Sequence, residues 1–476
     1  MQKKSKNIIV FLTISICLLF GFSVKASTLT LNDSPYYFLN DTTITGALII
    51  EAGVVVNIGE MVKVRLEGDL IINGTANDPV TFNPTHSDGW EIFLVHAYTG
   101  RVNIKHAIMN EGRFEFRVKA VRIDNVVYNS NQNLAWNGAF TRIKLDNYDS
   151  LHISNCELNG INKGEGFLIH NAVNPIVENC IFDKVPDAVE FIDCIGGIIT
   201  NSKFTDNNDD AIDLNNCENT EISYNTISGV SNRGLEIGSE NFGNSVGIHV
   251  FKNIIFNCSI GISFKENSDG LVENNTLYNN DLAISSLEDK VDFGGSTINV
   301  LSTLLNENVE DFEVDGVSFV NFNYCMTDNA PLLGSNNLTG SAEFVDALGD
   351  DFHLTAISPC IDKGSPLSLI DTNNTNADIG ALPYYLLVNG NYVEGVSNLS
   401  IYPNPTQGMV TFELGKFYED VTLEIFDTGG RLINKQEGSG LAFHFNMSDS
   451  KFKEGIYFVK ITGEEFGIHS SKIVKY

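Results

Sequence analysis

The stretch from Leu151 to Asp289 repeats one pattern of polar and apolar positions six times. In each repeat an apolar residue follows a polar turn, and successive repeats are 21 to 29 residues apart. These apolar residues are Leu158, Phe182, Phe204, Ile227, Phe256 and Leu277. A regular period of this length without helical spacing predicts a solenoid, because a single unit cannot bury its apolar face and the units must stack.

A second set of positions predicts the phase of a strand within each repeat. Each repeat has a small residue followed by apolar residues that alternate with a mostly polar one. The small residues are Gly166, Ala188, Ala211, Gly234, Gly261 and Ala283. Alternation with a period of two is typical of a β-strand with one buried face. The residues expected to point outward in one row are Leu168, Glu190, Asp213, Glu236, Ser263 and Ser285.

Asparagines mark the turn before the apolar residue in five of the six repeats. They are Asn155, Asn179, Asn201, Asn253 and Asn274. We expect these amides to stack and to hydrogen-bond to one another along the axis. With this pattern the chain resembles the right-handed parallel β-helix proteins, which include pectate-lyase-like enzymes and many bacterial surface proteins. We therefore predict an all-β fold, in which a right-handed parallel β-helix solenoid is followed by a small C-terminal β-sandwich.

The N-terminal residues are predicted to be an export signal. Lys3, Lys4 and Lys6 precede the apolar run Ile8–Val24, and a small-residue cleavage pattern ends at Ala26. We therefore predict a signal peptide at 1–26, a β-helix at 27–385 and a linker at 386–398. We find no later stretch apolar enough to span a bilayer and expect no transmembrane segment in the mature chain.

Residues 399–476 differ in composition and form a predicted second domain. They contain Tyr-Pro-Asn-Pro at 402–405, Asp-x-x-Gly at 427–430 and Gly-Ile-Tyr at 455–457. Short alternating strands between Pro and Gly turns favour a small β-sandwich. This segment resembles the type A C-terminal sorting domain of the type IX secretion system. The resemblance implies that the secretion machinery recognises the tail, that the tail is removed, and that the protein is secreted or displayed at the cell surface.

The charge of the chain is strongly negative but uneven. The formal net charge is −30, and loss of the predicted signal peptide removes four lysines and no acid. Such a charge argues against nucleic acid or anionic lipid as a partner. From Arg101 to Lys144, however, eight basic residues face only three acidic ones. We align Arg117 with Arg142 and Lys119 with Lys144, so one face should be basic at its start and acidic in later turns.

We consider three functions for this face. The first is catalysis on an extracellular polysaccharide, in which a calcium-dependent lyase is favoured over a glycoside hydrolase. Carboxylates stacked on neighbouring strands repel, so they must share a proton or bind a cation such as Ca²⁺. Lyases of this fold family use calcium beside Arg or Lys, as the resemblance implies. The motif order also echoes polygalacturonases, from which only Asp209 and Asp210 carry over, since Arg233 stands where that family has histidine.

We assign roles to the basic and acidic residues of this face and to residues beside them. We predict Lys144 and Arg233 as catalytic residues. The predicted substrate-binding residues are Arg117, Lys119, Arg142 and Lys265. The predicted metal ligands are Glu190, Asp209, Asp210, Asp213 and Glu236.

The second and third functions need no chemistry. A solenoid offers long rows of side chains that suit an extended glycan, and we favour such a binding function over catalysis. Alternatively, the acidic face is simply solvated, and the protein is a structural or adhesin module.

Cys194 and Cys217 fall in one column of adjacent turns, as do Cys156 and Cys180, and we favour buried thiols over disulfides there.

Overall fold

A computed structural model describes residues 23–476 except for several short stretches. The residues left out are 88, 131–139, 146–149, 161–163, 240–242, 370, 372–374, 385–399, 403, 405, 407, 429–430, 449–450, 464–466 and 476. The predicted linker and most of the predicted signal peptide therefore lie outside the described residues. The chain forms two compact units, which we describe separately. The first comprises residues up to 177, 181–197 and 206–218, and the second comprises 178–180, 198–205 and 219–476.

The fold is almost entirely β, as predicted. Within the described residues the only helical elements are two short 3-10 turns, η1 (Leu31–Asp33) and η2 (Ala347–Gly349). No helix among these residues is long and apolar enough to cross a membrane. The strands pair in parallel from one turn of the solenoid to the next, and the second unit ends in an antiparallel sheet.

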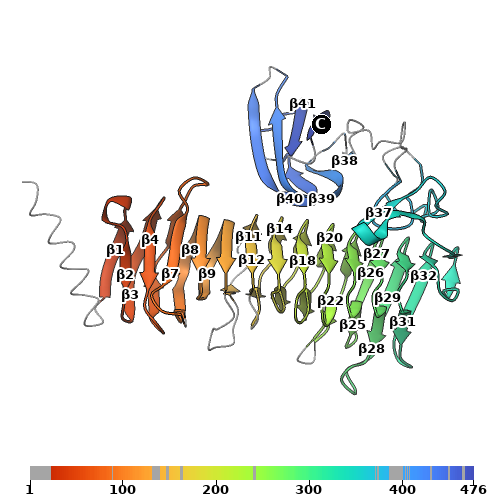
Figure 1. Cartoon of the computed structure of the whole chain (residues 1–476), viewed down its shortest axis with the longest axis horizontal. Coiled ribbons are helices and arrows are strands. Elements are labelled where there is room, and N and C mark those ends of the chain that lie inside the picture. The colour runs from red at the N-terminus through yellow and green to blue at the C-terminus, as the bar shows by residue number, and fades with distance from the viewer. Residues whose placement is uncertain are drawn as a thin grey trace, which may run out of the picture. The chain divides into compact units, whose positions relative to one another are not determined.

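In the first unit the strands stack in chain order (Figure 1). Strand β9 pairs with β8 on one side and with β10 on the other, and the same sheet continues through β13 and β16 to β19. The strands of this unit are β1 (Ser23–Leu29), β2 (Tyr36–Phe38), β3 (Thr42–Glu51), β4 (Val55–Ile58), β5 (Lys63–Glu67), β6 (Leu70–Asn73), β7 (Val80–Pro84), β8 (Ile92–Asn110), β9 (Phe114–Asn129), β10 (Thr141–Leu145), β11 (Leu151–Ser154), β12 (Glu157–Asn159), β13 (Phe167–His170), β15 (Ile181–Asp183), β16 (Val189–Ile192) and β19 (Ile212–Asn215), with β14 (Ile176–Glu178) at the boundary.

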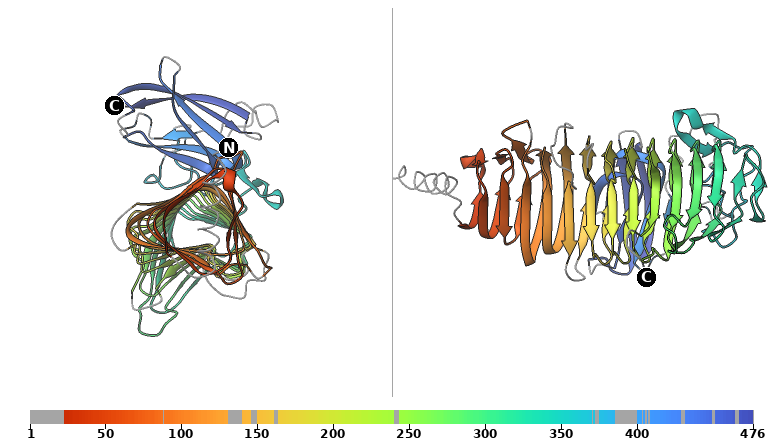
Figure 2. Two further views of the ribbon diagram at one scale, coloured as in Figure 1. Left: turned by 90° about the vertical axis from the view of Figure 1, so that its left-hand side faces the viewer. Right: turned by 90° about the horizontal axis from the view of Figure 1, so that it is seen from below.

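The second unit contains later turns of the solenoid in three columns of parallel strands, visible in Figure 2. One column is β17, β20, β23, β26, β29 and β32, another is β18, β21, β24, β27, β30 and β33, and the third is β22, β25, β28 and β31. The bounds are β17 (Ile198–Thr200), β18 (Lys203–Thr205), β20 (Glu221–Ser223), β21 (Thr226–Ser228), β22 (Arg233–Gly238), β23 (Ile248–Phe251), β24 (Ile254–Phe256), β25 (Ile260–Lys265), β26 (Asp269–Glu273), β27 (Thr276–Tyr278), β28 (Leu282–Leu287), β29 (Thr297–Leu301), β30 (Leu304–Asn306), β31 (Glu310–Val314), β32 (Phe319–Asn323), β33 (Met326–Thr327), β34 (Gly334–Ser335), β35 (Leu338–Thr339), β36 (Phe344–Asp346) and β37 (Asp351–Leu354).

The predicted inward positions are confirmed, but the residues of the predicted outward row are also at most 9% exposed, namely Leu168, Glu190, Asp213, Glu236, Ser263 and Ser285. Phe167, Val189 and Ile212 are register partners and are fully buried. One apolar position was assigned wrongly: Leu277 pairs with Ile255, not with Phe256. Strand β24 reads Ile-Ile-Phe, and three apolar residues in a row hide the alternation that would reveal which ones point inward.

The asparagine column combines two different roles that the sequence did not separate. Asn155, Asn179, Asn201 and Asn274 adopt positive φ angles, which asparagine tolerates better than most residues. Asn253 instead lies one position later, because the residue with positive φ in that turn is Lys252. Asn225, Asn253 and Asn275 form one row of amides that bond along the axis. Asn225 Nδ2 donates to Asn253 Oδ1 at 3.0 Å, and Asn253 Nδ2 donates to Asn275 Oδ1 at 3.0 Å.

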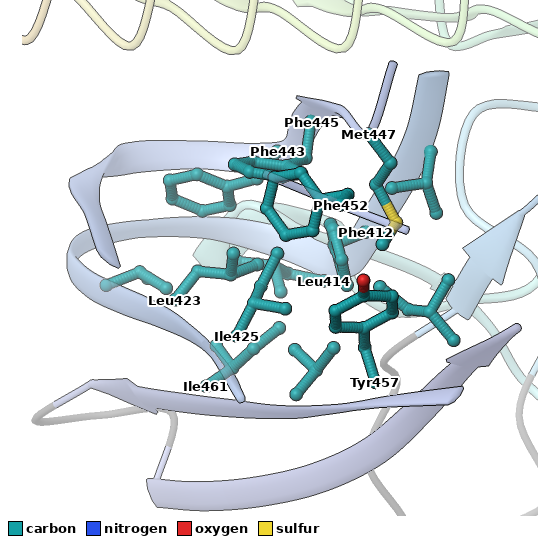
Figure 3. Close-up of a cluster of buried hydrophobic side chains, with 14 residues drawn as sticks. Phe412, Leu414, Leu423, Ile425, Phe443, Phe445, Met447, Phe452, Tyr457 and Ile461 are labelled. Carbon is teal, nitrogen blue, oxygen red and sulfur yellow. The ribbon is translucent and has the colours of Figure 1, made fainter. Parts of the chain in front are cut away.

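The C-terminal strands form a sheet with its own core. They are β38 (Ser400–Tyr402), β39 (Met409–Phe426), β40 (Leu432–Asn446), β41 (Gly455–Gly463) and β42 (Gly467–Lys475). The strands form one antiparallel sheet, in which the 18-residue β39 pairs with β38, β40 and β41. Phe412, Leu423, Phe443, Tyr457 and Ile461 belong to the buried cluster of this domain (Figure 3).

Candidate functional site

Four basic side chains lie on four successive strands of the first unit. Register pairs His96 of β8 with Arg117 of β9, Arg117 with Lys144 of β10, and Lys144 with His170 of β13. We call these four residues the basic row. Side chains at paired positions of parallel strands point to the same face, and neighbouring strands are about 4.8 Å apart. The basic row is therefore a straight line of imidazole, guanidinium and ammonium groups, about 14 Å long.

This register corrects the alignment proposed from the sequence. Lys144 pairs with Arg117, not with Lys119, and Arg142 pairs with Glu115. Lys119 lies past the last residue that pairs with β10, where the register between β8 and β9 also shifts. The sequence could not decide this, because a shift of two residues keeps every side chain on its own face and leaves the alternation unchanged.

A second outward row runs beside the basic row. It contains Leu94, Glu115, Arg142, Leu168, Glu190 and Asp213 on successive strands. Arg142 is exposed, whereas Glu190 and Asp213 are only 7% and 9% exposed. Glu115 also forms an ion pair with Arg117, with 2.7 Å between Oε1 of Glu115 and Nη2 of Arg117. The predicted change from basic to acidic along the face is confirmed, but its carboxylates are recessed rather than solvated.

Asn215 holds the two recessed carboxylates in place. Its Nδ2 donates to Oδ2 of Asp213 at 2.8 Å and to Oε1 of Glu190 at 3.4 Å. Asn215 is itself buried, and it lies two strands from His170 in the same row. A carboxylate that is buried and hydrogen-bonded has a fixed direction, so this end of the face offers oriented acceptors.

His170 is the imidazole nearest to the centre of the face. Burial lowers its pKa, and the positive charges of Arg142 and Lys144 lower it further. Both effects favour the neutral ring at pH 7. A neutral imidazole beside two cations can accept a proton or a hydrogen bond, which neither Arg nor Lys can do when charged.

Three further carboxylates gather at a turn of the first unit. Asp187, Asp209 and Asp210 can each place one oxygen within 4.8 Å of the other two. The backbone N–H of Asp210 donates to Oδ1 of Asp187 at 3.2 Å. Oxygen ligands of this kind suit a hard cation such as Ca²⁺, which takes six to eight of them, with water completing the set. Two of the five predicted metal ligands, Asp209 and Asp210, thus form a group, with Asp187 as a third member that was not predicted.

The predicted residues Arg233, Glu236 and Lys265 of the second unit form ion pairs with one another. Oε2 of Glu236 is 2.5 Å from Nη1 of Arg233, and Oε1 of Glu236 is ion-paired with Nζ of Lys265. Lys265 also lies 3.8 Å from Asp289. Burial lowers the pKa of Lys265, but the hydrogen bond and charge of Glu236 outweigh burial and raise it. Both oxygens of Glu236 already contact cations of the protein, and its role as a metal ligand stays a prediction.

His96 and Tyr98, at the basic end of the face, were not predicted from the sequence. His96 accepts a hydrogen bond at Nδ1 from Nη2 of Arg65 at 3.3 Å, and its ring contacts Tyr98 at 4.7 Å between centroids. Tyr98 is 60% exposed. The outward phase of His96 after the buried Phe93 and Val95 could have revealed it, but the basic residues were counted only from Arg101 onward.

Comparison with known proteins assigns two regions of the chain. Residues 117–259 match the family described as right-handed β-helix region, and residues 400–476 match the secretion-system C-terminal sorting domain. The chain contains a right-handed β-helix and a type IX sorting domain. No curated protein matches the sequence. The basic row and the two recessed carboxylates lie on the β-helix, and the sorting domain supports export of the protein.

Three solved structures resemble parts of the β-helix protein weakly. The A-module of the mannuronan C-5 epimerase AlgE6 of Azotobacter vinelandii has 12% identity and a TM-score of 0.35, covering 63% of this chain and 90% of that one. Pectate lyase Pel9A has 12% identity and a TM-score of 0.26, covering 76% and 97%. Tailspike protein 2 of the Escherichia coli O157:H7 bacteriophage CAB120 has 9% identity and a TM-score of 0.20, covering 97% and 66%. At these values the likeness carries no argument about activity.

Proposed function

We propose that this β-helix protein binds a linear, anionic extracellular polysaccharide along its basic row. The observation that carries the proposal is the placement of His96, Arg117, Lys144 and His170 on four successive strands of a chain whose net charge is −30. A protein of this net charge repels anions over most of its surface, so a line of basic groups makes this face the place where an anion is attracted. Arg and Lys form charge-assisted hydrogen bonds with carboxylate and sulfate groups.

The regular spacing of the basic row supports a polymer rather than a small anion. Equivalent side chains recur at each strand, so a chain with a repeated anionic group can pair several of them at once. The flanking groups suit sugars. Tyr98 is an exposed aromatic ring beside His96, and aromatic faces pack against the apolar faces of sugar rings. Glu190, Asp213 and Asn215 can bond hydroxyl groups beyond the basic row.

Titration calorimetry of the mature chain with oligouronates and sulfated oligosaccharides tests this proposal. Arg117→Ala and Lys144→Ala are each expected to weaken binding of the best ligand about tenfold, about 1.4 kcal/mol, through loss of a charge-assisted contact. Lys184→Ala is the matched control, because Lys184 is an exposed lysine paired with Asp183 outside the basic row. No binding by any anionic oligosaccharide, or equal losses in all three variants, would refute the proposal.

The second candidate is a calcium-dependent polysaccharide lyase, which the Asp187, Asp209 and Asp210 group favours. Bound calcium would supply charge neutralisation of a uronate. Lys144 and Arg233 stay the predicted catalytic residues, and His170 beside Lys144 can accept a proton. Absorbance of an unsaturated product tests for turnover, and Ca²⁺ titration of the protein and of Asp210→Asn tests for the cation. Binding without turnover supports the first proposal, and neither binding nor turnover supports a structural or adhesin module.

The destination of the protein is part of the proposal. The sorting domain supports export, and we propose that the β-helix reaches the exterior of the outer membrane, secreted or held at the cell surface. Exterior location would place the basic row where extracellular polysaccharide is found.

A further inference from the structure

The second unit has an open depression that none of the roles above uses. Its volume is about 810 Å³, which falls within the range of ligand sites. Strands β23, β26 and β29 form its floor, whereas the ion-pair cluster of Glu236 belongs to the column of β22, β25 and β28. Its lining includes Gly247, His249, Asp269, Leu271, Thr297 and Asn299.

Two rows of outward side chains shape this depression. His249, Leu271 and Asn299 are register partners on β23, β26 and β29. In the neighbouring row Asp269 pairs with Thr297, and Thr297 pairs with Phe319 on β32, which is 56% exposed and lies one strand beyond the lining residues. The rows therefore combine amide, hydroxyl and imidazole groups with an aliphatic and an aromatic side chain in one plane.

Some polar groups of the depression are held by the protein, and others are available. Nε2 of His249 lies 3.2 Å from Oε2 of Glu273, and Oδ1 of Asp269 accepts from the N–H of Gly247 at 2.9 Å. Among the residues that the structure describes, the side chains of Thr297 and Asn299 make no hydrogen bond, and both are exposed. Their donors and acceptors point from a strand, which is a more rigid support than a loop.

The charge of the lining excludes the ligand class proposed for the first unit. The lining residues include no lysine or arginine, and Asp269 is exposed. Burial raises the pKa of Glu273, but hydrogen bonds from His249 and Ser368 outweigh burial and lower it, so Glu273 carries its charge at pH 7. An anionic ligand would be repelled. A ligand with hydroxyl groups and apolar faces, but without negative charge, matches the side chains present.

We propose that this depression is a second carbohydrate site, which binds a short stretch of a neutral saccharide. Asn299 and Thr297 would bond hydroxyl groups, and Leu271 and Phe319 would contact the apolar faces of the sugar rings. The site is independent of the basic row in residues and in ligand charge. Together the two sites would let one chain contact an anionic polymer and a neutral one.

Calorimetry or ligand-observed NMR with the full chain and cellotetraose, mannotetraose or xylotetraose tests this site. At least one of the three is expected to bind in the millimolar range, and Asn299→Ala and Phe319→Ser are each expected to weaken it about fivefold to tenfold. Both residues are exposed, so neither change should unfold the protein. Lys144→Ala is the reciprocal control and should leave neutral binding unchanged.

The outcomes separate this site from the basic row. If Asn299→Ala loses binding of the neutral saccharide but keeps binding of the anionic one, the protein has two independent sites. Absence of binding by all three neutral tetrasaccharides overturns the proposal. Binding that Asn299→Ala and Phe319→Ser leave intact overturns it too, and so does preferential binding of an amine-containing saccharide, which would assign the acidic groups as the recognition element.

Discussion

At the scale of the residue, position within a strand decides what a basic side chain can do. Lys119 and Lys144 are both exposed lysines on strands of the same sheet. Only Lys144 lies between Arg117 and His170, whereas Lys119 falls at a shift of register. A polymer that follows the basic row meets the Lys144 ammonium in line with its neighbours.

Lys119→Ala and Lys144→Ala therefore form a stringent pair. We expect Lys144→Ala to lower the affinity for an anionic oligosaccharide about tenfold and Lys119→Ala to lower it less than about threefold. Both variants remove one charge, but only Lys144→Ala removes a member of the basic row. Calorimetric titration at low salt measures both. Equal losses would mean that bulk charge, not alignment, attracts the ligand.

Glu266 shows at the same scale how burial changes the pKa of a carboxyl group. It follows β25 and is fully buried. Burial raises its pKa, and the nearby Lys265 and Lys290 only partly offset this, while Asp289 raises it further. A raised pKa in the folded state means that protonation stabilises the fold. This contribution is present below the pKa of the unfolded chain and is lost as pH rises through the folded pKa.

Glu266→Gln should therefore stabilise the protein at pH 7 by about 1 kcal/mol, because the amide has the same shape and no charge to bury. The advantage should shrink as pH falls, because wild-type Glu266, whose pKa is raised, then takes up its proton. Urea unfolding at several pH values measures the difference, with the exposed Glu310→Gln as control. A pH-independent difference would contradict the assignment of Glu266 as the titrating group.

At the scale of the element, the turns of the second unit are joined by buried amides. Asn253 is fully buried, donates from Nδ2 to the carbonyls of Ile222 and Phe251 and to Asn275, and accepts from Asn225. Every hydrogen-bonding capacity of the amide is used between consecutive coils, so its loss leaves buried partners unsatisfied.

Asn253→Ala is expected to lower the free energy of unfolding by about 2 kcal/mol or more. Asn299→Ala, an exposed asparagine on β29, should change it by less than about 0.5 kcal/mol. Thermal and urea unfolding followed by circular dichroism compare the two. If both variants unfold like the wild type, the amide row does not stabilise the solenoid and the apolar core alone does.

At the scale of the whole molecule, electrostatics and export are the relevant properties. The net charge of −30 and the basic row act together on an anionic polymer, and salt screens both. The Debye length falls from about 10 Å at 0.1 M to about 3 Å at 1 M, so exposed ion pairs weaken strongly over this range. Hydrogen bonds to a neutral sugar do not depend on ionic strength in this way.

Raising NaCl from 0.1 to 1 M is thus expected to weaken anionic binding at least about tenfold and to leave neutral binding within about twofold. Calorimetric titrations of each ligand class at both salt concentrations provide the measurement. Parallel weakening of both ligand classes would show that a single charged surface binds them.

Removal of residues 400–476 should abolish export, because this segment matches the secretion-system sorting domain and has a core of its own. The truncated chain is expected to accumulate inside the outer membrane, whereas the full chain leaves it. Cell fractionation with immunoblotting distinguishes the two, and circular dichroism of the truncated chain checks that the β-helix is folded. Equal amounts outside the cell would show that another segment directs export.

The architecture could be predicted from the sequence, because a solenoid is specified locally. The alternation of apolar and polar residues around Phe167, Val189 and Ile212 predicted strands, phase and stacking, and turn motifs identified the tail. Each coil contacts only its neighbours, so a repeat in sequence becomes a repeat in space. The acidic residues Glu190 and Asp213 were placed in one row for the same reason.

Which residues share a site, and whether they are buried or charged there, depends on register and packing. The alignment of Lys144 with Arg117 depends on register, which alternation leaves open by two residues. No local pattern encodes the recessed state of Glu190, which Asn215 contacts from the next strand, or the fully buried state of Glu266. Sequence therefore predicts the order of side chains along a face, whereas packing decides their neighbours and their charge.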